Sequence, residues 1–229
     1  MNDVLGQALN DYFHNQRGSK LWINNKYGPK EEMPVATYFR GEDDMPDIEW
    51  MALEQCRGKV LDIGAGAGSH ALYLQEQGLD ITAMDISPLG AAVMAARGVK
   101  KTLEADIFTY NQPGYDTLLL LMNGIGLAGT IAGLKKLLLH LKTLLNDDGQ
   151  ILFDSSDIAY LYEGKLPAAG YYGEIQYQYS YKKNKTEWFN WLYVDEQTLK
   201  QVALETGFNL EVLIEDEHGQ YLTRLTKAV

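Results

Sequence analysis

The residues with the clearest potential for chemistry lie in the segment VLDIGAGAG. In this segment a carboxylate precedes three alternating glycines: Asp62, Gly64, Gly66 and Gly68. Glycines at this density allow a backbone to approach a ligand closely, because they carry no side chain and adopt left-handed backbone angles without strain. A carboxylate in front of such a loop repels a phosphate and attracts a cation. The pattern therefore predicts a loop that binds a positively charged ligand.

The segments around this loop alternate between strand and helix patterns. Buried strands are predicted at 59–64, 79–87, 100–108, 115–124 and 150–156, and helices at 69–78, 88–98 and 131–149. Alternation of this kind indicates a parallel sheet covered by helices. Ligands bind at the carboxyl edge of such sheets, and the glycine loop is expected at that edge.

The two ends of the chain depart from this alternation. The predicted elements are a helix at 4–13, an irregular stretch at 17–34, a helix at 47–56, an aromatic β-hairpin around KKNK at 174–194, a helix at 196–207 and an antiparallel strand pair at 208–217 and 220–228. Asp195 is expected to cap the last of these helices, and Gly207 to end it.

Two ligand classes fit the glycine loop. Gly66, Gly68 and Ala71 satisfy the dinucleotide spacing G-x-G-x-x-A, whereas an acidic residue just before the loop is typical of adenosyl ligands without a pyrophosphate. LDIGAGAG resembles the first motif of the class I S-adenosylmethionine-dependent methyltransferases, and AMDIS and EADIF supply the acidic residues that end the next two strands. The resemblance implies a Rossmann-like α/β fold, with a seven-stranded, mostly parallel sheet, helices on both faces and an antiparallel C-terminal strand.

The resemblance also implies a domain organisation. Residues 1–46 are expected to form an N-terminal helical lid, and residues 47–229 the methyltransferase domain, with the aromatic hairpin inserted at about 171–194. Arg40 precedes the first motif, where such enzymes often place a residue that touches the methionine carboxylate. A surface arginine is the alternative interpretation.

Carried over residue by residue, the family's roles fall first on the glycine loop. Gly64 and Gly66 admit S-adenosylmethionine, and the Ala65 backbone meets its amino-acid end. Asp62 reaches the amino group, and Asp85 accepts both ribose hydroxyls through its two oxygens. Structural roles stay open for both acids: Asp62 as a cap of the loop's own N–H groups, and Asp85 as the N-cap of the next helix.

Further cofactor contacts are expected beyond the loop. By the same resemblance, Asp106 lies beside the adenine ring, with Ile86 and Ile107 on the two sides of that ring. Met122 and Asn123 lie under the methionine moiety. Asp106 is otherwise an acid in a surface turn, and the two isoleucines are otherwise part of the core.

Composition limits the remaining possibilities. The chain has 229 residues, is 46% hydrophobic and has a formal net charge of −11, with no Lys/Arg-rich run. Tight binding to a nucleic acid backbone is therefore not expected. Cys56 is the only cysteine, so no intramolecular disulfide forms. No metal-ligand spacing or catalytic residue is identified, and His70 is expected at the solvent edge of its helix.

These observations predict an S-adenosylmethionine-dependent methyltransferase that acts on a small-molecule acceptor by in-line transfer. We expect a cytoplasmic monomer or homodimer that has neither nucleic acid nor membrane as a partner. The alternatives are an NAD(P)-dependent Rossmann oxidoreductase and a non-catalytic S-adenosylmethionine-binding module. Tyr177, Tyr179 and Tyr181 share one face of the predicted hairpin, where they line an acceptor pocket, cover a sheet edge or form a dimer contact.

Overall fold

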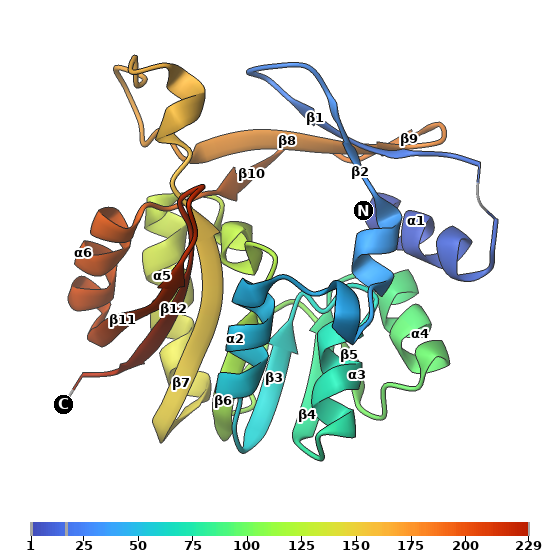
Figure 1. Cartoon of the computed structure of the whole chain (residues 1–229), viewed down its shortest axis with the longest axis horizontal. Helices are drawn as coiled ribbons and strands as arrows, with labels where there is room; N and C mark the ends of the chain where they lie inside the picture. The colour runs from blue at the N-terminus through green and yellow to red at the C-terminus, as the bar shows by residue number, and fades with distance from the viewer. Residues whose placement is uncertain (1, 17, 229) are drawn as a thin grey trace. The chain divides into compact units, whose positions relative to one another are not determined.

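The computed structural model describes residues 2–16 and 18–228 (Figure 1). Its α-helices are α1 (Val4–Phe13), α2 (Asp47–Gln55), α3 (Ser69–Glu76), α4 (Pro88–Arg97), α5 (Ile131–Leu144) and α6 (Glu196–Thr206). Short 3-10 helices are η1 (Val35–Phe39), η2 (Glu42–Asp44), η3 (Gly124–Ala128) and η4 (Ala159–Tyr162). The strands are β1 (Leu21–Asn25), β2 (Glu31–Met33), β3 (Lys59–Ile63), β4 (Asp80–Asp85), β5 (Thr102–Glu104), β6 (Tyr115–Leu120), β7 (Leu145–Ser156), β8 (Glu174–Tyr181), β9 (Asn184–Lys185), β10 (Phe189–Leu192), β11 (Phe208–Glu215) and β12 (Gln220–Lys227).

The strands form two sheets. A seven-stranded sheet has the order β11-β12-β7-β6-β3-β4-β5, and a five-stranded sheet has the order β10-β8-β1-β2 with β9 paired to β8. In the larger sheet β4–β5 and β6–β7 are parallel, whereas β12 is antiparallel to both β7 and β11. The predicted Rossmann-like α/β fold with an antiparallel C-terminal end is therefore confirmed.

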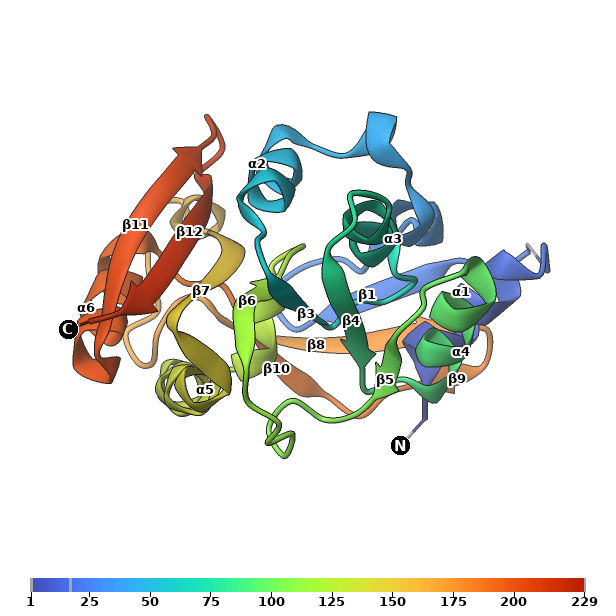
Figure 2. The same cartoon turned by 90° about the horizontal axis from the view of Figure 1, so that it is seen from below.

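The chain folds into two compact units. Unit 1 contains the described residues of Met1–Met45, Leu61–Tyr110 and Gln176–Phe189, and unit 2 contains those of Pro46–Val60, Asn111–Ile175 and Asn190–Val229. In unit 1, helices α3 and α4 lie on opposite faces of strands β4 and β5 (Figure 2). In unit 2, helices α2 and α5 lie on opposite faces of β6 and β7 (Figure 2).

The apolar run of β6 is covered on both of its faces. Leu118, Leu119 and Leu120 are each fully buried, although successive residues of a strand point to opposite sides of a sheet. The inner face of α5 is likewise buried and contributes five leucines: Leu134, Leu137, Leu138, Leu141 and Leu144. This burial explains why β6 lacks the apolar–polar alternation of a strand with one wet face.

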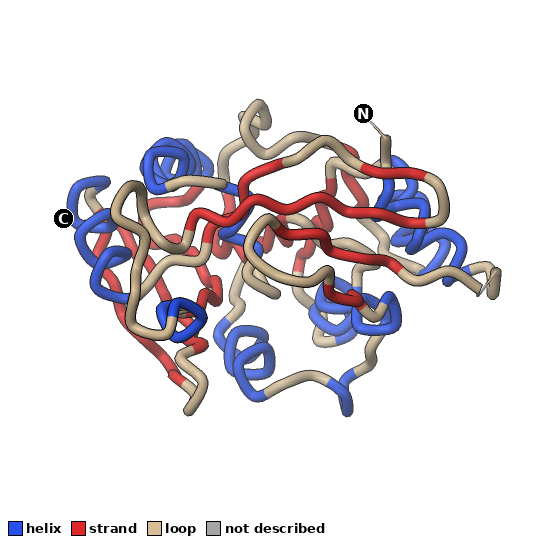
Figure 3. The backbone as a smooth tube through the Cα atoms, turned by 90° about the horizontal axis from the view of Figure 1, so that it is seen from above, coloured by secondary structure: helices blue, strands red, loops and turns tan. Residues whose placement is uncertain are grey.

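The segment predicted to be irregular, 17–34, begins at a residue outside those described, and over 18–34 the prediction was wrong. This segment contains β1 and β2, which pair antiparallel with each other, and β1 also pairs antiparallel with β8 (Figure 3). The register runs from Leu21↔Tyr181 to Asn25↔Tyr177. Because the partner strand lies far along the chain, the local pattern of turn residues did not indicate the pairing.

Two further predicted boundaries differ in detail. Helix α5 ends at Leu144 rather than near residue 149, and β7 begins at once, with a register shift against β6 between Tyr115↔Leu145 and Thr117↔Gln150. Asn146 Nδ2 lies within this irregular stretch and donates to Asp116 Oδ1 at 2.7 Å. The predicted hairpin forms at KKNK, but its second strand is split into β9 and β10. Among the described residues, no helix is both long and apolar enough to span a membrane.

Leu118→Ala tests the buried sheet. We expect the free energy of unfolding to fall by about 2–5 kcal/mol, because the substitution leaves a cavity in the packed core. Urea denaturation followed by circular dichroism measures the change. Leu204→Ala is the matched control, since Leu204 is 79% exposed, and it should change stability by less than about 0.5 kcal/mol. Equal losses in the two variants would contradict this account of the core.

Candidate cofactor-binding site

The glycine loop connects β3 to α3 in unit 1. The backbone N–H groups of Gly64 and Ala65 both donate to the Met84 carbonyl at the end of β4, each at 2.9 Å. Gly64, Gly66 and Gly68 all have positive φ angles, of 75°, 58° and 81°. These angles are costly for residues with a side chain, so the loop's conformation requires its three glycines.

The surroundings of these glycines differ. A Cβ atom on Gly64 would meet nothing within 4 Å, whereas one on Gly66 would lie 3.1 Å from the Tyr38 ring and one on Gly68 2.9 Å from Val99 Cγ2. Open space therefore adjoins the backbone at Gly64. The Ala65 carbonyl accepts a hydrogen bond from the Gly68 N–H at 2.8 Å and keeps a second lone pair.

Asp62 lies at the end of β3 and is only 2% exposed. Its Oδ2 atom is buried and accepts no hydrogen bond from any described residue. Burial raises the pKa of this carboxyl from 3.8 to about 6, while the charge of His70 lowers the pKa and that of Asp85 raises it. A buried carboxylate oxygen without a donor is costly, and the ammonium group of a bound amino acid moiety would satisfy it.

His70 does not lie at the solvent edge, so that expectation was wrong. The residue is 7% exposed, in the first turn of α3. It shares the buried face of the helix with Ala71 and Leu74, at the spacing of an apolar helical stripe. Its charge acts on Asp62, which is how it enters the electrostatics of the site.

The Asp85 carboxylate joins the two β–α connections of unit 1. Its Oδ2 accepts from the Gly66 N–H at 2.9 Å, and its Oδ1 accepts from the Ser87 N–H at 2.8 Å. Burial raises its pKa, and these backbone hydrogen bonds oppose the rise. The N-cap of α4 is Ser87, whose Oγ accepts from the Gly90 N–H at 2.8 Å, so Asp85 is not the cap. Each Asp85 oxygen retains lone-pair capacity for a further donor.

The residues after β5 form a tight turn. Asp106 Oδ1 accepts from the Phe108 N–H at 2.9 Å, which leaves its other oxygen outside this hydrogen bond. Ile86 is 59% exposed, whereas Ile107 is 6% exposed. Phe108, beside Ile107, is 46% exposed. The sequence analysis did not predict it as an adenine contact, although an aromatic residue next to such a contact indicates stacking.

The N-terminal segment supports the loop from outside. The Ser69 hydroxyl donates to the Tyr38 carbonyl at 2.9 Å, and Arg97 Nη1 donates to the Ala67 carbonyl at 2.6 Å. Arg40, at the end of η1, is half-buried and lies two residues after Tyr38. The supporting role of Arg97 was not predicted, because α4 follows the loop only after the intervening strand β4.

Met122 and Asn123 belong to unit 2 and follow β6. Both have left-handed backbones, with φ angles of 60° and 53°, which are unusual for residues other than glycine. The Asn123 N–H donates to Asp154 Oδ2 at 2.9 Å, and its Nδ2 donates to the Leu192 carbonyl at 3.1 Å. Its buried Oδ1 accepts no hydrogen bond from the described part of the chain. Strained backbone and an unsatisfied oxygen at a strand end are typical of binding sites.

The strand–loop–helix has bare glycines, a buried acid before them and a second acid at the end of the next strand. These features define an α/β fold of the nucleoside-binding class. Residues 43–213 match a family model described as a methyltransferase domain. Comparison with curated proteins finds no match. No group of His, Cys, Asp and Glu among residues 2–16 and 18–228 is arranged to hold a metal ion.

Solved structures agree with the family match. A SAM-dependent methyltransferase from Bacteroides fragilis, crystallised with S-adenosyl-L-homocysteine, is 40% identical over 99% of this chain and 95% of its own, with a TM-score of 0.92. A methyltransferase from Clostridium acetobutylicum is 14% identical over 82% and 94% of the two chains, with a TM-score of 0.60. The sugar N-methyltransferase KedS8 from Streptoalloteichus is 16% identical over 90% and 97%, with a TM-score of 0.59. The chain belongs to the methyltransferase domain family, and it is a class I methyltransferase that uses S-adenosylmethionine.

The Asp62→Asn variant tests whether the Asp62 carboxylate serves ligand binding rather than protein stability. We expect the affinity for S-adenosylhomocysteine at pH 7.5 to fall by about 1.5–3 kcal/mol, the scale of a hydrogen bond to a charged group. Because the folded-state pKa of about 6 lies above the ordinary 3.8, the Asp62 carboxyl lowers wild-type stability as pH rises through that window. The variant lacks this loss. Calorimetry measures the affinity, and urea denaturation at pH 5 and pH 7.5 measures the stability.

The same two measurements show what would contradict this interpretation. Asp62 would be a structural cap if the Asn variant bound S-adenosylhomocysteine normally. A variant that lost stability relative to wild type as pH rose from 5 to 7.5 would show that the buried carboxylate is satisfied by the protein.

Proposed function

We propose that this methyltransferase transfers the methyl group of S-adenosylmethionine in line to a small-molecule acceptor. The observation that carries the donor's placement is the buried Asp62 oxygen, which has no partner among the described residues and belongs to the residue two positions before Gly64, the first glycine of the loop. The donor supplies a methyl group already activated by its sulfonium. The protein then has to align the acceptor and exclude water, without forming a covalent bond itself.

The proposed donor contacts follow from the residues described above. Asp62 binds the ammonium group, Asp85 the ribose hydroxyls, and Asp106 the adenine amino group. The complete proposed set is Arg40, Asp62, Gly64, Ala65, Gly66, Asp85, Ile86, Asp106, Ile107, Met122 and Asn123. The exposure of Ile86 and Phe108 supports a stacking surface for adenine formed by these two side chains.

An aromatic row in unit 1 supports a small acceptor. Tyr177, Tyr179 and Tyr181 pair with Asn25, Ile23 and Leu21 of β1, so they share one face of the smaller sheet. Tyr179 and Phe189 meet edge to face, with ring centroids 5.1 Å apart. Tyr181 is buried against α1, whereas Tyr177, Tyr179 and Phe189 are half-buried. A surface formed by these three rings suits an apolar, aromatic or cationic molecule, and the net charge of −11 argues against a nucleic acid.

The wider setting is part of the same proposal. Residues 1–46 act as a lid on the domain formed by 47–229, and the aromatic hairpin at about 171–194 contributes to acceptor binding. The enzyme works in the cytoplasm, with which its free thiol at Cys56 is compatible. It acts as a monomer or homodimer. The comparisons do not support a nicotinamide-dependent oxidoreductase. The family match and the relative crystallised with S-adenosyl-L-homocysteine support a methyltransferase rather than a non-catalytic cofactor-binding module.

Cofactor selectivity is tested by thermal unfolding. S-adenosylhomocysteine at about 100 times its dissociation constant should raise the midpoint by roughly 5–10 °C, because binding to the folded state alone stabilises it. NADH at the same concentration should leave the midpoint unchanged. A shift with NADH alone would contradict the assignment of the donor.

Acceptor size is tested by transfer of label from methyl-tritiated S-adenosylmethionine to a fractionated cell extract. We expect label in the small-molecule fraction, together with release of S-adenosylhomocysteine. The Asp85→Ala variant is the control for background transfer. Label confined to protein or nucleic acid would overturn the small-molecule proposal, and tight donor binding without any transfer would favour the non-catalytic alternative.

A further inference from the structure

Helix α1 packs between two parts of unit 1. Its Leu9 side chain is buried together with Ala67 of the glycine loop and Val93 of α4. On another face, Val4 and Ala8 are buried together with Leu21 and Tyr181 of the smaller sheet. One face of the helix therefore packs on the glycine loop, and another face packs on the aromatic strand β8.

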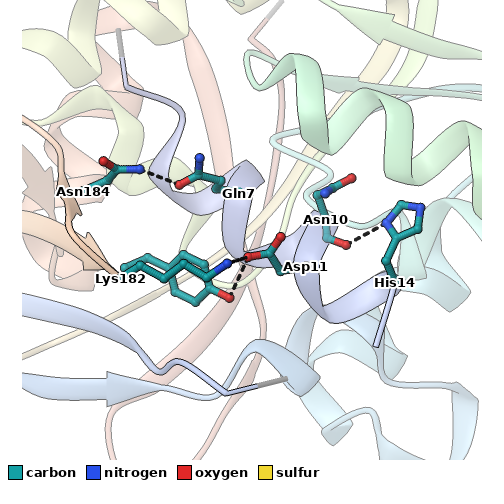
Figure 4. Close-up of polar contacts among 7 residues, drawn as sticks. Gln7, Asn10, Asp11, His14, Lys182 and Asn184 are labelled. Carbon is teal, nitrogen blue, oxygen red and sulfur yellow. Dashed lines mark hydrogen bonds and ion pairs between the residues drawn. The ribbon is translucent and has the colours of Figure 1, made fainter. Parts of the chain in front are cut away.

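Polar contacts fix α1 to the turn between β8 and β9 (Figure 4). Asp11 is 7% exposed and accepts hydrogen bonds from the Tyr181 hydroxyl, at 3.1 Å, and from Lys182 Nζ. Asn184 Nδ2 donates to Gln7 Oε1 at 2.7 Å (Figure 4). These contacts belong to the middle of the helix and do not touch the donor site.

Asp3, the N-cap residue of α1, contacts the start of α4 as well as its own helix. Asp3 Oδ1 accepts from the Gly6 N–H at 2.9 Å, which caps α1. Asp3 Oδ2 accepts from the Ser87 hydroxyl at 2.7 Å and from the Leu89 N–H at 3.3 Å. One carboxylate thus accepts backbone donors from the first turns of α1 and α4, where the helix dipoles favour a negative charge.

This contact requires a close approach of the two helix starts. A Cβ atom on Gly6 would lie 2.2 Å from Ser87 Oγ and 2.3 and 2.4 Å from the two Asp3 carboxylate oxygens, so any residue other than glycine would displace the side chains that make this contact. Glycine within a helix is about 1 kcal/mol less favourable than alanine. Gly90, in the first turn of α4, is similarly close to the loop, since its Cβ would lie 3.2 Å from the Gly66 carbonyl oxygen.

Ser87 is the residue through which α1 reaches the donor site. Its hydroxyl is held between the Asp3 carboxylate and the Gly90 N–H, while its own N–H donates to Asp85 Oδ1. We propose that Asp3 is a positioning residue for the donor ribose, which acts through Ser87 to hold the Asp85 carboxylate in its binding orientation. The proposal rests on the proposed function, in which Asp85 binds the ribose hydroxyls.

The negative charge of Asp3 opposes ribose binding by Asp85, whereas the hydrogen bond from Ser87 to Asp3 favours it. Burial, and to a lesser extent the charge of Asp3, raises the pKa of Asp85. Removal of that charge makes the ionised form of Asp85 easier to reach, and ionised Asp85 is the better acceptor for hydroxyl groups. A loss of affinity after removal of Asp3 therefore reports on geometry rather than on charge.

Asp3→Ser is the decisive variant, because serine still caps a helix but is too short to hold Ser87 as aspartate does. Calorimetry at pH 7.5 should show S-adenosylhomocysteine bound about fivefold more weakly, as expected for the loss of one hydrogen bond. The 2′,3′-dideoxy analogue of S-adenosylhomocysteine should bind the variant and the wild type equally. Without ribose hydroxyls, the orientation of Asp85 no longer affects binding.

Three further variants make the outcome unambiguous. Asp85→Ala should weaken the binding of S-adenosylhomocysteine more than that of the dideoxy analogue, because the variant loses the ribose contact in addition to the hydrogen bonds that Asp85 accepts from Gly66 and Ser87. Asp11→Asn, which loosens α1 at the β8–β9 turn, should lower the thermal midpoint and leave the affinity unchanged. Gly6→Ala should weaken binding as Asp3→Ser does, although alanine favours the helix, and it serves as the second test if Asp3→Ser folds poorly.

Three results overturn the proposal without affecting the ribose assignment. The first is normal affinity in both Asp3→Ser and Gly6→Ala while Asp85→Ala binds weakly. The second is an equal loss of affinity in Asp11→Asn, and the third is a loss in Asp3→Ser that persists with the dideoxy analogue, since either means that general docking of α1 sets the affinity. Normal binding by Asp85→Ala would instead remove the ribose assignment, and this proposal with it.

Discussion

The hydrogen bonds between the end of β4 and the glycine loop are the constraint on which the rest of unit 1 depends. The Met84 carbonyl accepts from Gly64 and Ala65, and the next residue, Asp85, accepts from Gly66. Two successive positions of one strand thus hold three consecutive backbone N–H groups of the loop. The arrangement fixes a backbone that has no side chains with which to fix itself, and it aligns the acid of β4 with the acid of β3.

Asp62 shows the cost of this arrangement. A carboxylate that is 2% exposed, with one oxygen lacking a partner among the described residues, disfavours its charged form, which is why burial raises its pKa. Selection for stability alone would favour a neutral residue at this position. A cationic ligand reverses the balance, because pairing with the buried charge is worth most where water is excluded. The cost of burying this carboxylate is therefore expected at a binding site and not in a purely structural core.

Local signals predicted much of the fold. Helix α1 has the expected bounds, and Asp195 and Gly207 begin and end α6 because capping and left-handed termination depend only on neighbouring residues. The pairing of β1 with β8 was missed because it joins distant segments. The same division holds for the candidate site: the position of the loop between β3 and α3, and of Asp62 and Asp85 near the ends of β3 and β4, was predicted from the sequence, whereas their roles in binding stay predictions. The burial of His70 and the contacts of Arg97 and Asp3 depend on how distant elements pack.

The residues that the sequence did not predict share one role, which is to order the glycine loop from outside the motif. A loop rich in glycine buries little surface of its own and pays a high entropic cost to become ordered, so its order has to come from elements outside the motif. Here Leu9 packs with Ala67, Tyr38 approaches Gly66, and Arg97 donates to the Ala67 carbonyl. The sequence motif therefore identifies where the ligand binds, whereas the N-terminal segment and α4 determine how rigidly the loop backbone is held. Differences in donor affinity between proteins that share the motif are then expected to arise largely in those supporting elements.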